Sequence, residues 1–163
     1  MTTYHQRRPK KTITDEREMI EIITGQKVMT LAMARGDEPY LVTVNYGFDE
    51  VQRCCYFHCS RVGKKADFLR ANPVVWGQVT EDRGYIAGAC DHAFRTVQFR
   101  GRVEFLEGDE EKRRALAVMV EHLEPDPEPV KQRLITPESL ERVAVGRVQI
   151  EEMTAKRNPA KDA

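Results

Sequence analysis

The stretch YFHCSRVGKKADFLRANP, residues 56–73, decides how this chain folds around a possible ligand. Its first residues are typical of a strand, and they deliver His58 at the strand's end. Gly63 then interrupts the strand, and Lys64 and Lys65 open a segment with helical spacing. A helix N-terminus favours an anion, and two lysines add full charges there. We therefore predict an anion, such as a phosphate, at this point; an exposed lysine pair on an ordinary surface helix is the alternative.

Short strands dominate the sequence on both sides of this stretch. Strand patterns occupy residues 27–34, 40–48, 54–60, 74–80, 93–107 and 142–153, and helix patterns occupy 14–25, 64–71, 109–123 and 137–141. The glycine-bearing residues 81–92 predict a loop, and EPDPEP, residues 124–129, predicts a stiff connector because proline cannot continue a helix. Closely spaced strands with few helices indicate a mainly β fold, an antiparallel barrel with peripheral helices.

Composition limits the classes of function. The 163 residues suffice for one domain, which we place at 14–156, between a mobile basic arm at 1–13 and a loose tail at 157–163. The chain carries 26 basic and 26 acidic residues, so no global field favours nucleic acid or an acidic membrane. No apolar run approaches the roughly 20 residues that span a bilayer, and no secretory signal precedes the domain. We expect a soluble, cytoplasmic protein.

The cysteines are expected to be free thiols in such a compartment: Cys54, Cys55, Cys59 and Cys90. Zinc held by cysteines together with His92 is the weaker alternative. It is disfavoured because side chains alternate along a strand, so that Cys55 and His58 point to opposite faces. The C-x-x-C spacing typical of structural zinc is also missing. We expect small buried side chains in a strand and no metal ligands.

Two more segments place polar groups in a strand pattern. In FRTVQFRG, Arg95 lies on the apolar face of the predicted strand and Thr96 offers a hydroxyl beside it. An arginine fork suits a phosphate or a carboxylate, although a salt bridge to an acidic residue is the alternative. In YLVTVNYGF, Thr43 and Asn45 share one face, and nearby backbone groups could hydrogen-bond a flat heteroaromatic ring.

Four segments, in this order and spacing, carry a resemblance to a known family: VMTLAMARGDEPYLVTVNYGF, YFHCSRVGKKADFLRANPVV, FRTVQFRGRVEFLEGDEEKRRAL and VAVGRVQIEEMTAK. Together they resemble the pyridoxamine-phosphate-oxidase-like split-barrel flavoproteins, and among these the Nim-type proteins of nitroimidazole resistance. The resemblance runs from about Thr14 to Lys156. It implies a six-stranded antiparallel split β-barrel of the FMN-binding type, which forms a homodimer with FMN at the subunit interface.

The resemblance also implies roles for individual residues. Lys64 and Lys65, with Arg95, would grip the FMN phosphate, and His58 would face the isoalloxazine ring as the catalytic residue. From the residues alone, His58 could equally be a packed strand histidine without a role in catalysis. The residues that would contact FMN are Val42, Thr43, Val44, Asn45, Phe57, His58, Lys64, Lys65, Arg95 and Thr96.

An FMN-dependent oxidoreductase that reduces nitro-aromatic or similar small molecules is the function that the resemblance implies. Two departures from the family pattern are a threonine, Thr96, where serine is frequent, and Ala155 where glycine is common. The arginine-rich substrate signature of true pyridoxamine-phosphate oxidases is not visible, so oxidation of vitamin B6 is not expected. A flavin- or haem-binding carrier without turnover of its own is the alternative function, since a fold does not decide activity.

Overall fold

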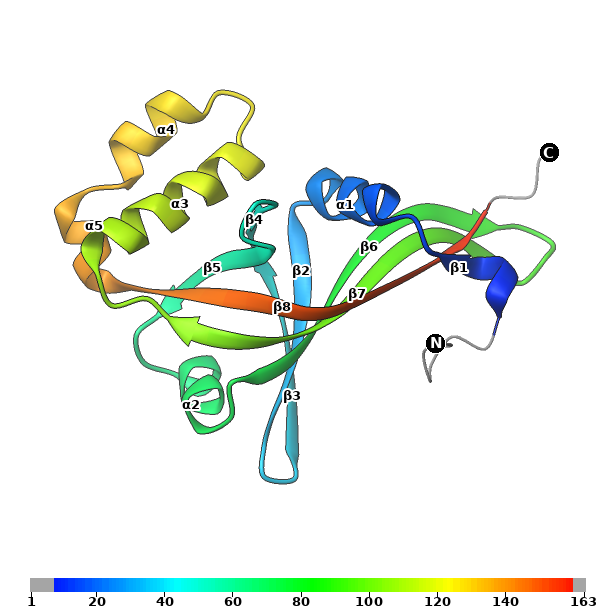
Figure 1. The fold of residues 1–163 in the computed structure, drawn as a ribbon, viewed down its shortest axis with the longest axis horizontal. Coiled ribbons are helices and arrows are strands. Elements are labelled where there is room, and N and C mark those ends of the chain that lie inside the picture. The colour runs from blue at the N-terminus through cyan, green and yellow to red at the C-terminus, as the bar shows by residue number, and fades with distance from the viewer. Residues whose placement is uncertain (1–7, 160–163) are drawn as a thin grey trace.

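The computed structural model describes residues 8–159 of the chain (Figure 1). The predictions for residues 1–7 and 160–163 lie outside the described residues. The elements follow one another as η1, a 3₁₀ turn (Pro9–Lys11), β1 (Thr12–Ile13), α1 (Glu16–Gly25), β2 (Val28–Arg35), β3 (Glu38–Asn45), β4 (Gly47–Asp49), β5 (Cys54–Ser60), α2 (Lys64–Ala71), β6 (Val74–Ile86), β7 (Asp91–Phe105), α3 (Asp109–Leu123), α4 (Pro127–Leu134), α5 (Pro137–Arg142) and β8 (Val143–Asn158).

The strands of residues 8–159 form one antiparallel sheet in the order β3-β2-β6-β7-β8-β5-β4, with β1 added on β8. The six long strands are β2, β3, β5, β6, β7 and β8, and the short β1 and β4 extend them. The predicted mainly β fold, a split barrel with peripheral helices, is confirmed. Within the same residues no helix combines the length and the apolar character that a membrane-crossing helix needs.

The sheet curls until its two ends meet, but it does not close. The chain passes from β3 through Tyr46 directly into β4, which pairs with β5 from Asp49↔Cys54 to Gly47↔Tyr56. Residues 57–60 of β5 continue past the end of β4 toward β3, and the ladders of the described residues contain no pairing between β3 and β5. We call this opening, between β3 and residues 57–60, the split.

Apolar side chains from the strands fill the barrel, and helices close its ends. Met19, Ile22 and Ile23 of α1 and Phe68 and Leu69 of α2 join the barrel core, at opposite ends of β2 in Figure 1. Burial of each such side chain stabilises the fold by about 1.5–3 kcal/mol. Helix α2 therefore has a fixed position beside the split, and this position sets where its N-terminus lies.

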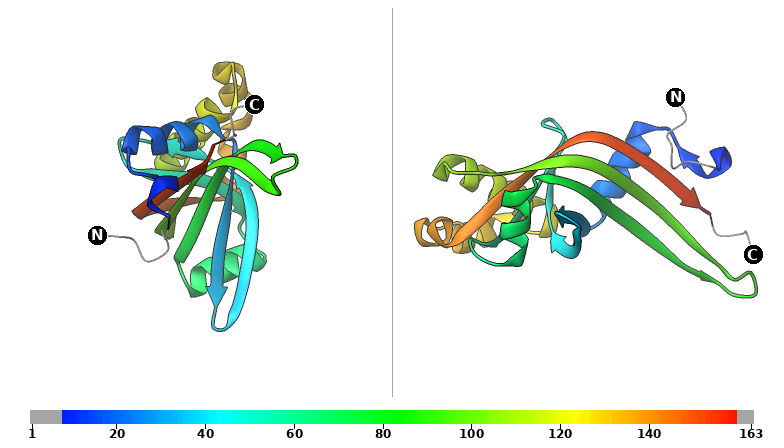
Figure 2. Two further views of the ribbon diagram at one scale, coloured as in Figure 1. Left: turned by 90° about the vertical axis from the view of Figure 1, so that its right-hand side faces the viewer. Right: turned by 90° about the horizontal axis from the view of Figure 1, so that it is seen from below.

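A second, smaller apolar cluster joins α3 to the outside of the sheet. Cys54 and Tyr56 of β5 and Val145 of β8 pack there against Ala115 and Met119 of α3. Helices α4 and α5 follow α3 at this end of the molecule, whereas the β6–β7 hairpin extends from the opposite end (Figures 1 and 2).

The loop predicted at residues 81–92 is confirmed only for residues 87–90, which form a turn, and is wrong for the rest. β6 runs to Ile86 and β7 begins at Asp91, with a register shift between Asp82 and Tyr85. Cross-strand partners explain the strands: Glu81 lies opposite Arg95, and Asp82 bonds the ring of His92. Paired backbone groups and charges hold a ribbon that has no apolar alternation, so the hydrophobic pattern did not reveal it.

The connector predicted at residues 124–129 is partly a helix. α4 begins at Pro127, because a proline in the first helical turn gives up an N–H group that would have no partner there anyway. The N-cap of α1 is Asp15, and its carboxylate accepts a hydrogen bond of 2.9 Å from the Arg17 amide.

The predicted arm and tail contain ordered structure within the described residues. Residues 9–13 form η1 and β1, and the side chain of Ile13 is only 1% exposed because β1 pairs with β8. β8 itself continues to Asn158, whose side-chain amide donates a hydrogen bond of 2.6 Å to the His92 carbonyl. Both differences arise because sheet pairing accepts polar sequences that lack an alternating pattern.

Candidate functional site

The N-terminus of α2 offers an open position for an anion. Gly63 precedes the helix with a φ of +126°, a conformation that favours glycine, and no atom lies within 4 Å of a Cβ built on it. The first intrahelical bond runs from the Asp67 amide to the Gly63 carbonyl (3.0 Å). The amides of Lys64 and Lys65 precede that bond and face the helix end. These residues therefore fit a phosphate group.

Lys64 extends from α2 toward β3, one edge of the split. Its amino group lies 4.9 Å from the ring centre of Tyr40 and 5.2 Å from that of Phe68. It also donates a hydrogen bond of 2.7 Å to Glu38, and this bond lowers the pKa of the Glu38 carboxyl although some burial opposes the shift. Lys64 therefore lies against β3, in one exposed ion pair with Glu38 and beside the rings of Tyr40 and Phe68.

Lys65 extends toward β5, the other edge of the split. Its amino group lies 5.9 Å from the ring centre of Phe57. The pKa of the neighbouring His58 is lowered, first by burial of the ring and then by the positive charge of Lys65. The two lysines at one helix end therefore reach the two edges of the opening in the barrel.

The strand residues predicted to line a flavin divide between two faces of β3. Val44 is buried in the barrel core and Val42 packs against it, whereas Thr43 and Asn45 are exposed on the outer face. The Thr43 hydroxyl lies 3.3 Å from that of Thr30, so it already has a partner. The side chains of the two valines are therefore turned away from a ligand on the outer face, and only their backbone groups remain for it.

Phe57 and His58 follow one another on β5 and point to opposite faces. The Phe57 ring is fully buried in the barrel, where a Cβ on Gly146 would come within 2.5 Å of it. His58 points to the outer face, where part of its side chain is exposed to solvent while its ring lines a cavity beside α3 and α5. Alternation along the strand thus gives Phe57 to the core and leaves only His58 available to a bound molecule.

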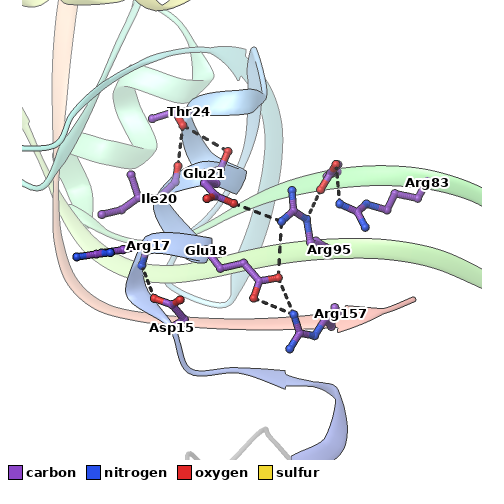
Figure 3. Close-up of polar contacts among 10 residues, drawn as sticks. Asp15, Arg17, Glu18, Ile20, Glu21, Thr24, Arg83, Arg95 and Arg157 are labelled. Carbon is purple, nitrogen blue, oxygen red and sulfur yellow. Dashed lines mark hydrogen bonds and ion pairs between the residues drawn. The ribbon is translucent and has the colours of Figure 1, made fainter. Parts of the chain in front are cut away.

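Arg95 is surrounded by carboxylates at another place in the barrel (Figure 3). Its Nε bonds Glu81, and its Nη1 lies 3.6 Å from a Glu18 oxygen and 3.7 Å from a Glu21 oxygen. The side chain is 18% exposed. Glu18 also accepts a hydrogen bond of 2.8 Å from Arg157. The network joins α1 to β6, β7 and β8. Arg95 thus forms salt bridges to acidic residues, which is the alternative to an anion-binding role given in the sequence analysis.

Arg95 and the two lysines do not share a pocket within one chain. Arg95 lies seven residues along β7 from Arg102, which pairs with Val74 just after α2. Seven residues of strand span roughly 23 Å. Within one chain Arg95 and the two lysines therefore contact different elements, and the prediction that they grip one phosphate at the subunit interface stays a prediction. Thr96 is 5% exposed and donates a hydrogen bond of 3.0 Å to the Val79 carbonyl, so its hydroxyl is used inside the sheet.

The comparison with protein families decides what kind of barrel this is. Residues 15–157 match the family model described as pyridoxamine 5'-phosphate oxidase. The chain belongs to the pyridoxamine 5'-phosphate oxidase family. The membership predicted from the sequence is therefore confirmed, and the match includes α1 to α5 and the strands from β2 to residue 157 of β8. No curated protein matches the chain.

Solved structures of three bacterial proteins illustrate the likeness. A protein from Bacteroides thetaiotaomicron, provisionally described as a 5-nitroimidazole antibiotic resistance protein, is 26% identical with a TM-score of 0.76, over 90% of this chain and 86% of that one. A FAD-binding protein from Mesorhizobium loti is 24% identical with a TM-score of 0.64, over 90% and 96% of the two chains. The FAD and heme binding protein from Mycobacterium smegmatis is 17% identical with a TM-score of 0.77, over 94% and 77%.

The cysteines of this family member are separated by the sheet. Cys55 lies in the barrel core and Cys54 in the cluster under α3, and burial raises the pKa of both thiols. Cys59 is half-buried and Cys90 is exposed. Among residues 8–159, no three His, Cys, Asp or Glu side chains lie close enough to hold a metal ion together. Cys54, Cys55 and Cys59 therefore act as small packing residues, whereas Cys90 is exposed.

The sequence pointed to α2 but missed the partner of Lys64. Glu38 lies 26 residues away along the chain, between the strands predicted at 27–34 and 40–48. The cavity beside His58 was missed as well, because it needs α3, α4 and α5 to fold back over β5. Both features depend on how strands and helices pack, and no local signal in the sequence marks them.

Proposed function

We propose that this protein binds FMN, with the phosphate at the N-terminus of α2 and the ring along the split, and acts as a homodimeric FMN-dependent oxidoreductase on nitro-aromatic or similar small molecules. The observation that carries the proposal is the placement of Lys64 and Lys65, which reach the two edges of the split from one helix end. The 26% identical structure, with its description as a nitroimidazole resistance protein, supports the substrate class.

The protein's own groups would hold the phosphate by charge and by hydrogen bonds. A phosphate monoester carries roughly −1.5 to −2 charges at neutral pH, and Lys64 and Lys65 would neutralise them. The first-turn amides of α2 add hydrogen bonds and the positive end of the helix dipole. Glu38 must release Lys64 or share it, because its carboxylate occupies that amine at 2.7 Å. Glu38 therefore sets how strongly the phosphate is held.

FMN would supply the transfer of electrons, and the chain would supply position and protons. The outer edge of β3 offers backbone N–H and C=O groups to the rim of a flat ring, because only its other edge pairs with β2 among the described ladders. The lowered pKa of His58 favours its neutral imidazole, which donates one hydrogen bond and accepts another. His58 therefore orients a substrate rather than attracting it by charge.

The homodimer is proposed from the outer face of β2, β3, β6 and β7. A groove of about 560 Å³ lies there, and it includes Leu41 and Trp76, which are 64% and 38% exposed. Polar side chains flank them, since Gln98 donates a hydrogen bond of 3.0 Å to Gln78. Exposed apolar side chains with a polar surround are typical of a protein interface.

The test is an absorbance spectrum of the purified protein, with identification by mass of whatever denaturation releases. We expect flavin absorbance and FMN, loss of that absorbance on reduction with substrate-dependent reoxidation, and the mass of a dimer in light scattering. Lys64→Gln with Lys65→Gln should weaken FMN binding at least tenfold, whereas Lys156→Gln on β8 should not. A colourless protein that does not take up added FMN overturns the proposal, and bound flavin without turnover identifies a carrier.

A further inference from the structure

A cavity of about 280 Å³ lies between β5 and the three helices at one end of the molecule. Ligand pockets commonly measure about 300–1,000 Å³, so this cavity suits a molecule of one substituted ring. Its walls are mostly apolar and its polar groups lie in different elements. The lining residues are His58, Leu116, Met119, Val120, Leu123, Glu124, Val130, Leu134, Ile135, Ser139 and Val143.

The cavity lies between the sheet and α4, which packs against α3. None of the residues of α4 is buried, and its apolar Leu134 is 52% exposed although it faces the cavity. Val130, one turn earlier on the same helix, also lines the cavity. Exposed apolar walls in a concave space are costly in water, and a bound apolar molecule would remove that cost.

The polar groups of the cavity restrict what can bind. The Ser139 hydroxyl donates to the Thr136 carbonyl (2.8 Å) and accepts from the Thr136 amide (3.0 Å), so the cap of α5 already uses it. Glu124 brings a negative charge that repels an anion. His58 remains as the group that can exchange a hydrogen bond with a ligand, and it lies next to Lys65 at the split.

We propose that this cavity binds a small neutral molecule with an apolar ring and one hydrogen-bonding group directed at His58. If the proposed function holds, on which this identification rests, that molecule is the substrate. The apolar ring would then lie under α3, α4 and α5, and its polar group would meet the proposed flavin side of β5. Residues 109–142, which form α3, α4 and α5 over the cavity, would determine which substrates bind.

The experiment measures binding to the flavin-free protein by calorimetry, so that it does not depend on turnover. Nitrobenzene serves as the neutral probe and 4-nitrobenzoate as its anionic counterpart. We expect nitrobenzene to bind at least tenfold more tightly than 4-nitrobenzoate. Leu134→Trp should fill the cavity and weaken nitrobenzene binding at least tenfold. Val51→Trp is the matched control, because Val51 is 93% exposed and lines a different groove.

Each outcome supports or overturns the proposal. Absence of nitrobenzene binding, or equal binding to wild type and to a folded Leu134→Trp variant, overturns it. Should Leu134→Trp unfold, Val130→Trp replaces it. A dimer that dissociates when Leu134→Trp is introduced would show that a second copy covers the cavity, which also overturns it. If nitrobenzene binds and FMN does not, the cavity proposal stands and the proposed function is refuted. If FMN binds and nitrobenzene does not, the proposed function stands and the cavity proposal is refuted.

Discussion

The amino group of Lys64 lies 2.7 Å from Oε1 of Glu38, so the cation proposed to hold a phosphate is already paired with a carboxylate on the opposite side of the split. Both side chains are about half exposed, at 52% and 48%. An exposed pair of this kind is weak and exchanges readily for a stronger partner. The pair therefore weakens the affinity of the α2 N-terminus for anions but does not prevent an anion from binding there.

Glu38→Gln should tighten FMN binding, because Lys64 loses its competing partner. We expect the dissociation constant to fall by roughly threefold, in line with the small contribution of exposed pairs. Fluorescence titration of the apoprotein with FMN measures it. Asp37→Asn removes the same charge from a neighbouring exposed residue that forms no ion pair among residues 8–159, and it should leave the constant unchanged. Weaker binding by Glu38→Gln would contradict the role given to the pair.

Lys65→Gln should raise the pKa of His58 toward the ordinary value near 6.5, because it removes the repelling charge while burial of the ring persists. NMR titration of the histidine ring protons follows it. Lys64→Gln, whose side chain extends to the other edge, is the control and should shift the His58 resonance less. A pKa of His58 that is insensitive to Lys65→Gln would mean that the lysine does not reach β5.

His122 should make the fold less stable in mild acid. Its Nε2 lies 2.7 Å from the Gln26 carbonyl and its ring lies 4.8 Å from that of Tyr46. Burial lowers the pKa of His122, the Gln26 bond opposes this, and the nearby Lys27 adds to the lowering. The folded state therefore binds the proton less well than the unfolded chain. Stability is present above the unfolded pKa near 6.5 and is lost as the pH falls through the folded pKa.

His122→Gln keeps an amide donor for the Gln26 carbonyl but cannot titrate. Urea unfolding at pH 7.5 and pH 5.5 should show a smaller loss of stability in this variant than in the wild type. His58 is present in both proteins, so its own titration cancels in the comparison. An identical loss in the two proteins would exclude His122 as a source of the acid sensitivity.

Arg95→Gln should destabilise the fold by about 1–3 kcal/mol, since Glu18, Glu21 and Glu81 would then face one another without the cation. Arg53→Gln, which breaks an exposed pair with Glu16, is the control and should cost less than about 1 kcal/mol. Thermal unfolding gives the comparison. The flavin contact of Arg95 stays a prediction, and a tenfold loss of FMN affinity by the folded Arg95→Gln variant would support it.

Gly146→Ala should destabilise the barrel by about 1–3 kcal/mol, the usual cost of overpacking, because its Cβ would come within 2.5 Å of the Phe57 ring. Gly25→Ala is the control, since nothing lies within 4 Å of a Cβ at that position. Chemical denaturation should separate the two variants. Equal stability would mean that the Phe57 ring can move aside, and β5 would then not be held rigidly beside the split.

The sequence by itself determined the elements whose signals are local. Alternating apolar residues gave the six long strands, and helical spacing with Gly63 and the lysine pair gave α2 and its exposed N-terminus. Where strand pairing stabilises a segment that has no alternating apolar pattern, the sequence did not predict the strand. Residues 81–86 lack an alternating apolar pattern and were predicted as a loop, yet they form a strand because β7 supplies partners such as Arg95.

Only the tertiary structure decided which of the predicted site residues belong together. Lys64 and Lys65 meet the two edges of the split because Phe68 and Leu69 anchor α2 in the core. Arg95, equally cationic in the sequence, is held by carboxylates on α1 and β6 at another place in the barrel. The reason is physical: residue type fixes what a side chain can bind, but long-range packing and strand register fix what it meets.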